Sequence, residues 1–545
     1  MFHQSFKISV ALAILLKTTH SCRRRRKESL IKALFSSKFE TPYVVSYLIN
    51  GLLAALLCFS GATGAKAQPL PPEKTRVLTI EEVVQMALTN NLDILISRLN
   101  PVIDQFAVNG LYGAYEPALS MSAVHNYDAF QGGFFTQTGQ NYGATVENIN
   151  SYTPGLAGTL PTGLSYNFTG PISRQNVSEF GLTGTDYQSG PGVTLSQPLL
   201  KNLWIDNARY QIQLSKKTLK MDQLALRLQI MTVINNIKAA YYNLIFARQN
   251  VQVEEEAVQL ARETMREDEQ RVRVGSLAPL DEKQAESQAA SAESDLLTAQ
   301  TSLVLQENVF KSLLAFRLGE WTGVTPVPSE QLLAVPENPD IQECWRAGLK
   351  NRPDLLQAKA GIEKQHVTIK YTYNQLFPEI DVLGSYGHNA TELTFGENLN
   401  TIRNGNYPYY SYGISLTIPL GNSGARYNYR SAKAGLEQLL LQLKKVESTI
   451  VVAIDNDVKT IRSDLLKVDS TRKARHYAEE ALQAEQTKLE HGKSTSFVVL
   501  QLQNNLTSAR SAEIRALADY NIALEQLAFD DGATLERNHI DLQAR

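Results

Sequence analysis

The sequence predicts an α+β membrane protein in which an internally duplicated chain combines a few β-strands with long antiparallel helical hairpins. Three observations support this fold class. The 545-residue chain repeats itself, residues 209–272 contain no glycine or proline, and short segments before the long helical stretches alternate apolar and polar residues. The repeat indicates a duplicated architecture, the uninterrupted stretch a long helix, and the alternation strands that separate an apolar from a polar environment.

The N-terminal 67 residues differ in composition from the rest. They hold ten Lys and Arg and two acidic residues, so the remainder has 43 basic and 53 acidic residues and a net charge of −10. An apolar stretch there ends in Ala65-Lys66-Ala67, the small-residue pattern of a signal-peptide cleavage site. We expect residues 1–67 to be a leader and signal peptide. A retained membrane anchor is less favoured, because Ser46 and Asn50 interrupt the apolar run.

Charge, cysteine content and motifs exclude several classes of function. A balanced or acidic chain is untypical of nucleic-acid-binding proteins. After cleavage only Cys344 remains, so no internal disulfide can form. The eight histidines are scattered, and no G-x-G-x-x-G, Walker or G-x-S-x-G motif occurs. We therefore expect no enzyme activity, no cofactor, no metal site and no nucleic-acid partner.

An internal repeat organises the chain after the leader. Residues 87–95 (ALTNNLDIL) resemble residues 348–356 (GLKNRPDLL), and Gly275 later aligns with Gly492. We expect repeat 1 to span 68–320 and to contain a helix, two strands and a helical hairpin. A proline-rich linker, 321–340, follows. Repeat 2 spans 341–530 with the same order of elements, and 531–545 is a C-terminal tail. Repeat 1 is 40 residues longer between its two strands. We expect this excess, within 127–190, to be a long surface loop that can hold extra strands such as TGLSYNFTG.

The long helices have narrow apolar seams. Apolar residues recur at spacings of three and four along the first helix of each hairpin, as in a coiled coil. The seam residues are Leu226, Ile230, Val233, Ile237, Tyr241 and Leu244 in repeat 1, and Leu443, Val446, Ile450, Ile454, Val458, Ile461 and Leu465 in repeat 2. A glycine suits the left-handed turn that ends a helix, so we expect hairpin tips near Gly275 and Gly492.

The clearest strand is residues 411–420, SYGISLTIPL. Tyr412, Ile414, Leu416 and Ile418 alternate with small or hydroxyl-bearing residues, a pattern typical of a membrane β-strand with one face toward lipid. We expect those four side chains to face lipid. Tyr407, Tyr409 and Tyr410 are further candidates for an interfacial aromatic belt. An ordinary sandwich strand explains the alternation equally well.

Four strands cannot close a barrel, and lipid does not tolerate open sheet edges. If the strands span a membrane, they must close with strands from other copies of the chain. The same copies would bring their helical hairpins together into a tube.

The sequence resembles the TolC-like outer-membrane efflux proteins (outer membrane factors) over almost the whole mature length. The segments that carry the resemblance are residues 78–91, 193–202, 351–363, 411–426 and 491–510. The resemblance implies a homotrimer with four strands per chain in a 12-stranded β-barrel, and a periplasmic α-barrel of helical hairpins. It also implies docking to a periplasmic adaptor (membrane fusion) protein.

The resemblance also implies roles for residues at the hairpin tips. It assigns adaptor contact to Val274, Gly275, Ala278 and Leu280, and less closely to His491 and Gly492. In every case the glycines are also expected to cap helices.

The family's periplasmic gate does not carry over to this chain. Its paired aspartates fall on Val498 and Gln501, and its arginine falls on Ser494. Asp281, after the first tip, is the candidate for a carboxylate ring at the mouth. The alternative, which we favour, is that Asp281 stabilises the start of its own helix.

These features predict an outer-membrane exit duct for a tripartite efflux or type I secretion system. The duct would receive substrates from an inner-membrane pump of the resistance-nodulation-division or ABC type through the adaptor. The alternative is a periplasmic adaptor or structural coiled-coil protein. Such a protein would share the long hairpins but would not need strands that face outer-membrane lipid.

Overall fold

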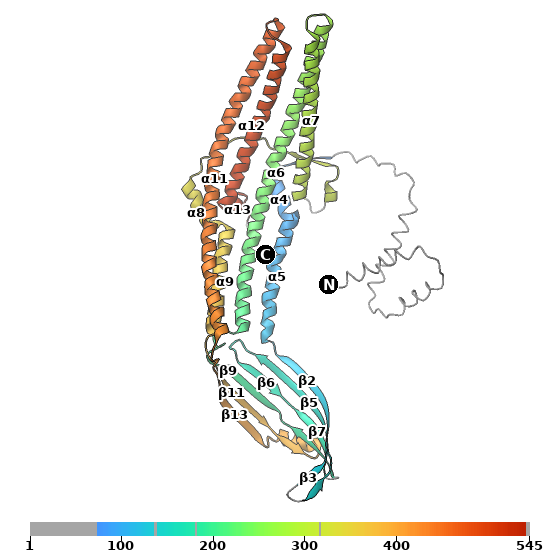
Figure 1. The fold of residues 1–545 in the computed structure, drawn as a ribbon, viewed down its shortest axis with the longest axis vertical. Coiled ribbons are helices and arrows are strands. Elements are labelled where there is room, and N and C mark those ends of the chain that lie inside the picture. Colours follow the sequence, from blue (N-terminus) through green and yellow to red (C-terminus); the bar gives the residue numbers. More distant parts are fainter. Residues whose placement is uncertain (1–73, 136–138, 180–181, 315–317, 541–545) are drawn as a thin grey trace, which may run out of the picture. The chain divides into compact units, whose positions relative to one another are not determined.

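The computed structural model describes residues 74–135, 139–179, 182–314 and 318–540, all within one compact unit. The predicted leader, 1–67, lies outside the described residues. Long helices form one part of this unit and a β-sheet the other (Figure 1). The predicted combination of a sheet with long antiparallel helical hairpins is therefore confirmed.

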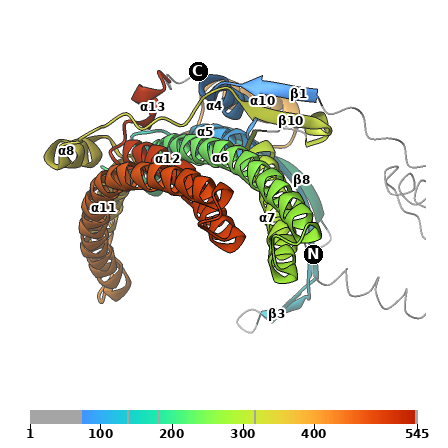
Figure 2. The same cartoon turned by 90° about the horizontal axis from the view of Figure 1, so that it is seen from above.

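Two helical hairpins dominate the fold. In the first, α6 (Asn207–Arg273) is followed by α7 (Pro279–Leu314); in the second, α11 (Ser423–Glu490) is followed by α12 (Ser496–Asp530). The two long helices have 67 and 68 residues, which at 1.5 Å per residue is roughly 100 Å each. Seen from above, α11, α12, α6 and α7 follow a single curved line (Figure 2).

Shorter helices pack against the halves of α6 and α11 nearer the sheet. They are α4 (Ile80–Asn90) and α5 (Leu92–Leu111) in the first repeat, and α8 (Ile341–Asn351) and α9 (Pro353–Asn374) in the second. Thr79 begins α4 with a capping box, because its hydroxyl accepts from the Glu82 amide while the Glu82 carboxylate accepts from the Thr79 amide. Asn91 caps α5 in a similar way, through the amides of Asp93 and Ile94.

The predicted seams form the cores. Ile230, Val233, Ile237, Tyr241 and Leu244 are buried against α4 and α7, and Ile450, Ile454, Val458 and Ile461 are buried against α8, α9 and α12; Leu226, Leu443, Val446 and Leu465 pack at their margins. Burial of each such side chain contributes about 1.5–3 kcal/mol. The seam prediction is confirmed.

The linker region is more ordered than its composition suggests. Strand β10 (Val324–Pro328) lies within it and pairs in parallel with β1 (Lys74–Leu78) beside the helices. Tyr241 of α6 donates a hydrogen bond to the Leu78 carbonyl at 3.0 Å, which anchors this small sheet on the first hairpin.

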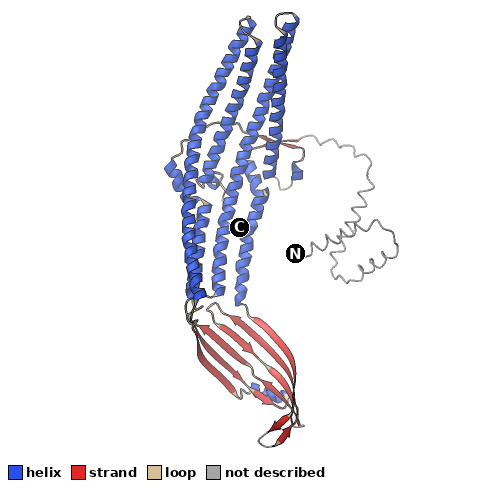
Figure 3. Cartoon of the chain, viewed as in Figure 1, coloured by secondary structure: helices blue, strands red, loops and turns tan. Residues whose placement is uncertain are grey.

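The large sheet contains nine strands, shown in red in Figure 3. They are β2 (Ala118–Phe130), β5 (Thr145–Thr159), β6 (Ser165–Thr169), β7 (Ile172–Glu179), β8 (Leu182–Ser189), β9 (Gly192–Pro198), β11 (Glu379–His388), β12 (Ala390–Glu392) and β13 (Pro408–Thr417). A separate pair, β3 (Gly133–Phe135) and β4 (Gln140–Tyr142), extends the loop after β2. Helix α10 (Phe395–Arg403) packs on β8 and β12.

Several of the nine strands continue one another. Thr169, the last residue of β6, pairs with Gly155 of β5. Ile172, the first residue of β7, pairs with Tyr152 of β5. The second pair lies three residues from the first, on β6–β7 and on β5 alike. The register is therefore unbroken across Gly170-Pro171, where proline removes a ladder donor. The same holds for β8 with β9 and for β11 with β12, whose pairings keep one register. The sheet thus consists of six continuous antiparallel strands, in the order β2, β5, β6–β7, β8–β9, β11–β12 and β13.

This strand count corrects the prediction of four strands per chain, two in each repeat. Repeat 2 contributes two continuous strands, as expected, but repeat 1 contributes four. The segment 127–190, expected mainly as a loop, holds most of the extra sheet. Within this segment, β5 and β6–β7 pair across the short turn after Thr159. They form one complete hairpin, inserted between β2 and β8–β9.

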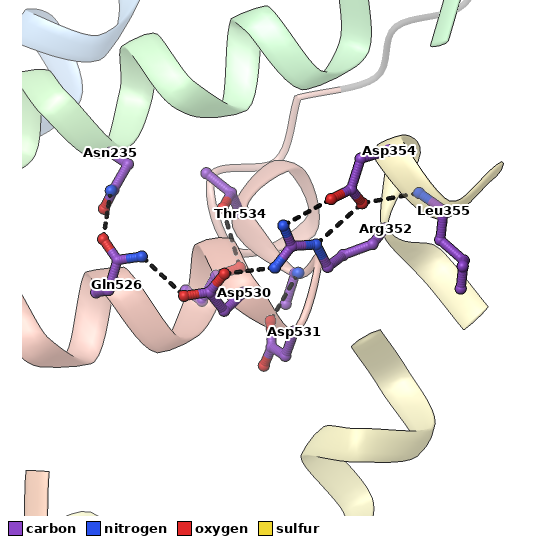
Figure 4. A network of polar contacts seen from close by, with 10 residues as sticks. Asn235, Arg352, Asp354, Leu355, Gln526, Asp530, Asp531 and Thr534 are labelled. Carbon is purple, nitrogen blue, oxygen red and sulfur yellow. Dashed lines mark hydrogen bonds and ion pairs between the residues drawn. The ribbon is translucent and has the colours of Figure 1, made fainter. Parts of the chain in front are cut away.

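A buried polar cluster holds the end of α12 against the start of α9 (Figure 4). The Arg352 guanidinium donates to both carboxylate oxygens of Asp354, at 3.0 and 2.8 Å, and to Asp530. Asp530 also accepts from Gln526 at 2.8 Å, and Gln526 in turn accepts from Asn235 of α6 at 2.9 Å. The Arg352 and Asp530 side chains are only 11% and 8% exposed. The cluster therefore links both repeats through buried, hydrogen-bonded charges.

Asp457 of α11 faces the same cluster. Burial, and then the neighbouring carboxylate of Asp530, raise the pKa of Asp457 to about 8, although Arg352 opposes the shift. Asp457 therefore carries a proton at neutral pH. An aspartate in the unfolded chain loses its proton near pH 4, so the native protein binds one proton more between about pH 4 and pH 8. The contribution of Asp457 to stability is consequently greatest in acid and falls as pH rises through that window.

We expect Asp457→Asn to remove this pH dependence. The amide keeps a donor toward Asp530 but cannot ionise, so the variant should be more stable than wild type by about 1 kcal/mol at pH 9, a value discounted for the partial exposure of the site. At pH 5 the two proteins should denature at the same temperature. Thermal denaturation of both proteins across pH 5–9 measures the difference, and a constant difference would contradict the assignment.

Candidate functional site

Both hairpin tips are built by the same hydrogen-bonded turn. After α6, the amide of Gly275 donates to the Val272 carbonyl and that of Ser276 to the Arg271 carbonyl, at 2.9 and 2.8 Å. Gly275 has a φ of +78°, a left-handed conformation that favours glycine. These two bonds define a Schellman turn, which satisfies the last free carbonyls of the helix.

The second tip repeats this geometry. The amide of Gly492, whose φ is +68°, donates to the Leu489 carbonyl, and that of Lys493 to the Lys488 carbonyl. His491 adds a contact between its ring Nδ1 and the Thr487 carbonyl at 2.7 Å. The capping role expected for both glycines is therefore present.

The first tip exposes apolar side chains. Val274 is 79% exposed and Leu280 is 66% exposed, and Ala278 between them is also exposed. At the second tip His491 and Gly492 are exposed, but they offer little apolar surface. Adaptor contact by these residues stays a prediction, stronger for the first tip than for the second.

Asp281 caps the helix that follows the first tip. Its carboxylate accepts from the Ala278 amide at 3.2 Å, while its own amide donates to the Ala278 carbonyl. This geometry is that of a helix-start residue, the reading favoured from the sequence. Of the three positions aligned with the family's gate, Ser494 donates to Glu485 at 2.5 Å, and Val498 and Gln501 carry no charge.

A contact missed by sequence reasoning joins the two hairpins just behind their tips. Ser496, the first residue of α12, donates a hydrogen bond to the carboxylate of Asp268 on α6, which is only 1% exposed. Burial raises the pKa of Asp268, against the opposing effects of the Ser496 bond and Arg271. The signal in the sequence is the position of Asp268, which follows Val258, Ala261 and Met265 at seam spacing, where an apolar residue is normal.

Further polar contacts join α6 to α12 along their length. The pairs are Thr264 with Gln503, Glu256 with Arg510, Asn250 with Ser511, Asn243 with Arg515, Lys238 with Glu525 and Asn235 with Gln526. These six pairs connect the two hairpins along the contact between α6 and α12.

We expect Ser496→Ala to loosen the tips. The variant leaves the buried carboxylate of Asp268 without its hydroxyl partner, a loss of about 1–3 kcal/mol. Hydrogen exchange of amides near the tips should accelerate, whereas exchange near Arg352 should not change. Ser494→Ala is the matched control, because the Ser494 hydroxyl bonds to Glu485 within its own hairpin and not to α6. Equal effects of the two variants would show that the contact with Asp268 has no special role.

The large sheet has one apolar face. One row of paired residues crosses all six continuous strands, and every side chain in it is apolar or aromatic: Leu119, Leu156, Phe168, Val193, Tyr386 and Tyr410. Because successive residues of a strand point to opposite faces, the same face also carries Met121, Tyr152, Leu195, Val382, Tyr412, Ile414 and Leu416. Most of these large side chains are exposed in the single chain, for example Tyr412 at 86% and Ile414 at 72%. We call this surface the apolar belt.

The opposite face is small and mostly polar. It carries Ser120, Ser122, Thr153, Gly155, Asn167, Thr169, Thr194, Ser196, Ser385, Ser411, Ser415 and Thr417, with Val124, Phe130, Ile149, Val177 and Leu383 as large apolar exceptions. Tyr409 also belongs to this face, where its ring lies against Gly192 and Gly387. The expectation that Tyr409 joins an outer aromatic belt with Tyr410 is therefore wrong, since adjacent strand residues face opposite ways.

Ile418 follows the last strand and is 56% exposed.

Among the helices that the structure describes, none combines the length and apolarity needed to cross a bilayer. Within the same described ranges, no group of three or more His, Cys, Asp or Glu side chains is placed to bind a metal ion.

A family model for outer membrane efflux proteins matches residues 163–315 and 346–533, more than half of the chain. The chain belongs to this family. The first matched segment begins within the sheet, before β6, and the second begins in α8; each segment includes one helical hairpin. The outer membrane efflux protein family places the sheet in the outer membrane and the helices in the periplasm.

Individual relatives are distant. The chain is 23% identical to nodulation protein T of Rhizobium leguminosarum bv. viciae over 55% of this chain, and the match spans only 59% of that relative. It is 21% identical to the outer membrane protein TolC of Escherichia coli, over 79% of this chain and 85% of TolC. The Campylobacter jejuni CmeC outer membrane channel superposes with a TM-score of 0.62 and 16% identity, over 86% and 90% of the two chains. This structural likeness establishes the efflux-protein fold.

Proposed function

We propose that three copies of the chain form the exit duct of a tripartite efflux or type I secretion system. One observation carries the proposal: a sheet with an exposed apolar belt on one face continues directly into long helical hairpins. Such a sheet suits lipid on one side and a wet lumen on the other. Helices of roughly 100 Å suit a periplasmic tube, because a compact core does not need such lengths.

The duct would have no chemistry of its own. Its substrates would come from an inner-membrane pump of the resistance-nodulation-division or ABC type, through a periplasmic adaptor that grips the hairpin tips. The homotrimer supplies the strands that one chain lacks, since open sheet edges are not tolerated in lipid. Outer-membrane lipid would contact the apolar belt, including Tyr412, Ile414, Leu416 and Ile418.

Planar bilayers test the duct. The purified full-length assembly should insert but conduct weakly, because the bond from Ser496 to Asp268 holds the two hairpins of each chain together behind their tips. The double variant Asp268→Asn, Ser496→Ala should conduct several-fold more, since it removes the contact behind the tips. A wide, constantly open conductance in wild type would instead indicate a self-contained porin. Failure of the purified protein to insert would favour the periplasmic adaptor alternative.

We expect the first tip to be the main adaptor contact. Val274→Asp and Leu280→Asp each place a charge where an exposed apolar side chain now lies, and should reduce adaptor crosslinking at least tenfold in native cells. Leu297→Asp is the matched control, because Leu297 is a similarly exposed apolar residue of α7 but lies away from the tip. Crosslinks to a membrane-fusion-type adaptor, identified by mass spectrometry, provide the measurement. Equal losses in all three variants would contradict a contact at the tip.

A further inference from the structure

We propose that copies of this chain close a β-barrel of eighteen strands, six from each of three copies, by pairing β13 of one copy with β2 of the next. This inference rests on the trimeric duct proposed above. It departs from the four strands per chain that the family resemblance implies. Its consequence is an exit wider than a 12-stranded barrel would give.

The inserted hairpin has the surface of a barrel wall. Leu156 and Phe168 belong to it and lie in the apolar row that also contains Leu119 at one edge of the sheet and Tyr410 at the other. Their neighbours Ala157 and Asn167, which pair with each other, belong to the opposite, polar face. A hairpin folded into the lumen or into the extracellular loops would not need to continue the apolar row without a gap.

The free edges of the sheet fit each other. Among the described strands, β2 pairs only with β5, and β13 pairs only with β11. Because the number of continuous strands is even, β2 runs away from the helices and β13 runs toward them, so the next copy meets this edge in antiparallel orientation. Six strands are too few to close alone. A second copy of the chain is therefore the occupant of each edge.

The apolar belt also has the tilt that a barrel requires. From Leu119, the exposed apolar residues of β2 continue away from the helices as far as Tyr127. Tyr410 of β13 lies in the same paired row as Leu119. From Tyr410, the exposed apolar residues of β13 continue toward the helices as far as Leu416. Paired rows run perpendicular to the strands, so a belt that crosses the rows obliquely means that the strands cross the membrane at a tilt. Tilts of about 35–45° are usual in closed barrels.

Barrel diameter grows roughly in proportion to the number of strands, so eighteen strands give a bore about 1.5 times that of twelve at equal tilt. The lumen face carries hydroxyl groups and glycines together with acidic side chains, namely Asp128, Glu147, Asp186, Glu379 and Asp381. The structure thus assigns the exit to cargo that is bulkier than a twelve-stranded barrel admits.

Single cysteines in the inserted hairpin test the wall directly. In the full-length chain carrying Cys344→Ser, Leu156→Cys and Phe168→Cys should be quenched by nitroxide-labelled lipid and should react slowly with a membrane-impermeant thiol reagent. Ala157→Cys and Asn167→Cys are the matched controls on the opposite face, and should react at least tenfold faster. If all four positions react alike with the aqueous reagent, the hairpin is not part of the wall and the eighteen-stranded barrel is excluded.

Ile414→Cys separates this failure from failure of the proposed duct. Lipid quenching at Ile414 together with aqueous exposure of Leu156→Cys and Phe168→Cys would leave an outer-membrane duct with fewer wall strands. Aqueous exposure at Ile414 as well would overturn both the duct and the barrel.

Removing the inserted hairpin tests the width. Replacement of 131–181 by an Asn-Gly turn would join β2 directly to β8–β9, a connection suited to a tight hairpin. Exclusion of neutral polyethylene glycols applied from the extracellular side should then show a cutoff diameter about one third smaller than wild type. An unchanged cutoff would overturn the wider exit. If this deletion does not assemble, the cysteine series still decides the number of strands in the wall.

Discussion

Replacing Arg352 by methionine is expected to destabilise the protein by about 3–5 kcal/mol, the usual cost of removing one partner from a buried ion pair. Arg352 holds Asp354 and Asp530 with three hydrogen bonds in a site where both Arg352 and Asp530 are almost fully buried. Without it, two carboxylates face each other beside Asp457, with no cation to offset them. The apparent melting temperature of the solubilised assembly should fall by many degrees.

Arg346→Met is the matched control. Arg346 lies on the preceding helix, is exposed, and donates only to a carbonyl of its own helix. It should change stability by less than about 0.5 kcal/mol. Adding Asp354→Asn and Asp530→Asn to Arg352→Met should recover part of the loss, because the uncompensated charges are then gone. A melting temperature for Arg352→Met equal to that of Arg346→Met would contradict the role given to the cluster.

An arginine at Ile414 should prevent stable insertion of the barrel. Ile414 lies in the apolar belt, and arginine on the lipid face of a membrane strand costs about 2–4 kcal/mol near the bilayer midplane. Three copies carry the substitution, so the penalty applies three times per assembly. Most of the protein should then be absent from the outer membrane, as measured by blotting separated membrane fractions.

Ser415→Arg is the control for that experiment. Ser415 is adjacent in the chain, but it faces the other side of the sheet, opposite Asp381. Arginine there would lie in water beside a carboxylate, so the variant should reach the outer membrane at wild-type levels. Equal loss of both variants would mean that this strand does not separate lipid from water.

The helical part of the fold could be predicted closely because its signals are local. Seam spacing and the glycine that ends each long helix act within one or two helical turns, and the absence of glycine and proline over 209–272 leaves the helix uninterrupted. The structure places helix ends at Arg273 and Glu490, directly before those turns. The tip geometry follows from the left-handed conformation that glycine tolerates.

The sheet was underestimated because its signals are weak and interrupted. Two strands of repeat 1 are interrupted, β6–β7 by Gly170-Pro171 and β8–β9 by Gly190-Pro191, and both dipeptides are typical of turns when only the sequence is considered. Beyond those points the strands are polar on both faces, so alternation disappears. Only the register, carried through the interruptions by neighbouring strands, reveals six continuous strands.

The polar contacts between hairpins could not be predicted, because partners such as Asp268 and Ser496 are 228 residues apart. Arg352 and Asp354 lie within the repeated segment 348–356, but their partner Asp530 lies at the far end of α12. Sequence spacing constrains side chains on one helix, and it contains no information on which helix lies opposite. Contacts of this kind become visible only with the three-dimensional structure.

The most direct test of a trimeric outer-membrane duct is to crosslink intact cells that produce the full chain and then to separate their membranes on a density gradient. The predicted result is a crosslinked species of three times the mature chain mass, found in the outer-membrane fraction. A monomer recovered in the soluble periplasmic extract would contradict the account.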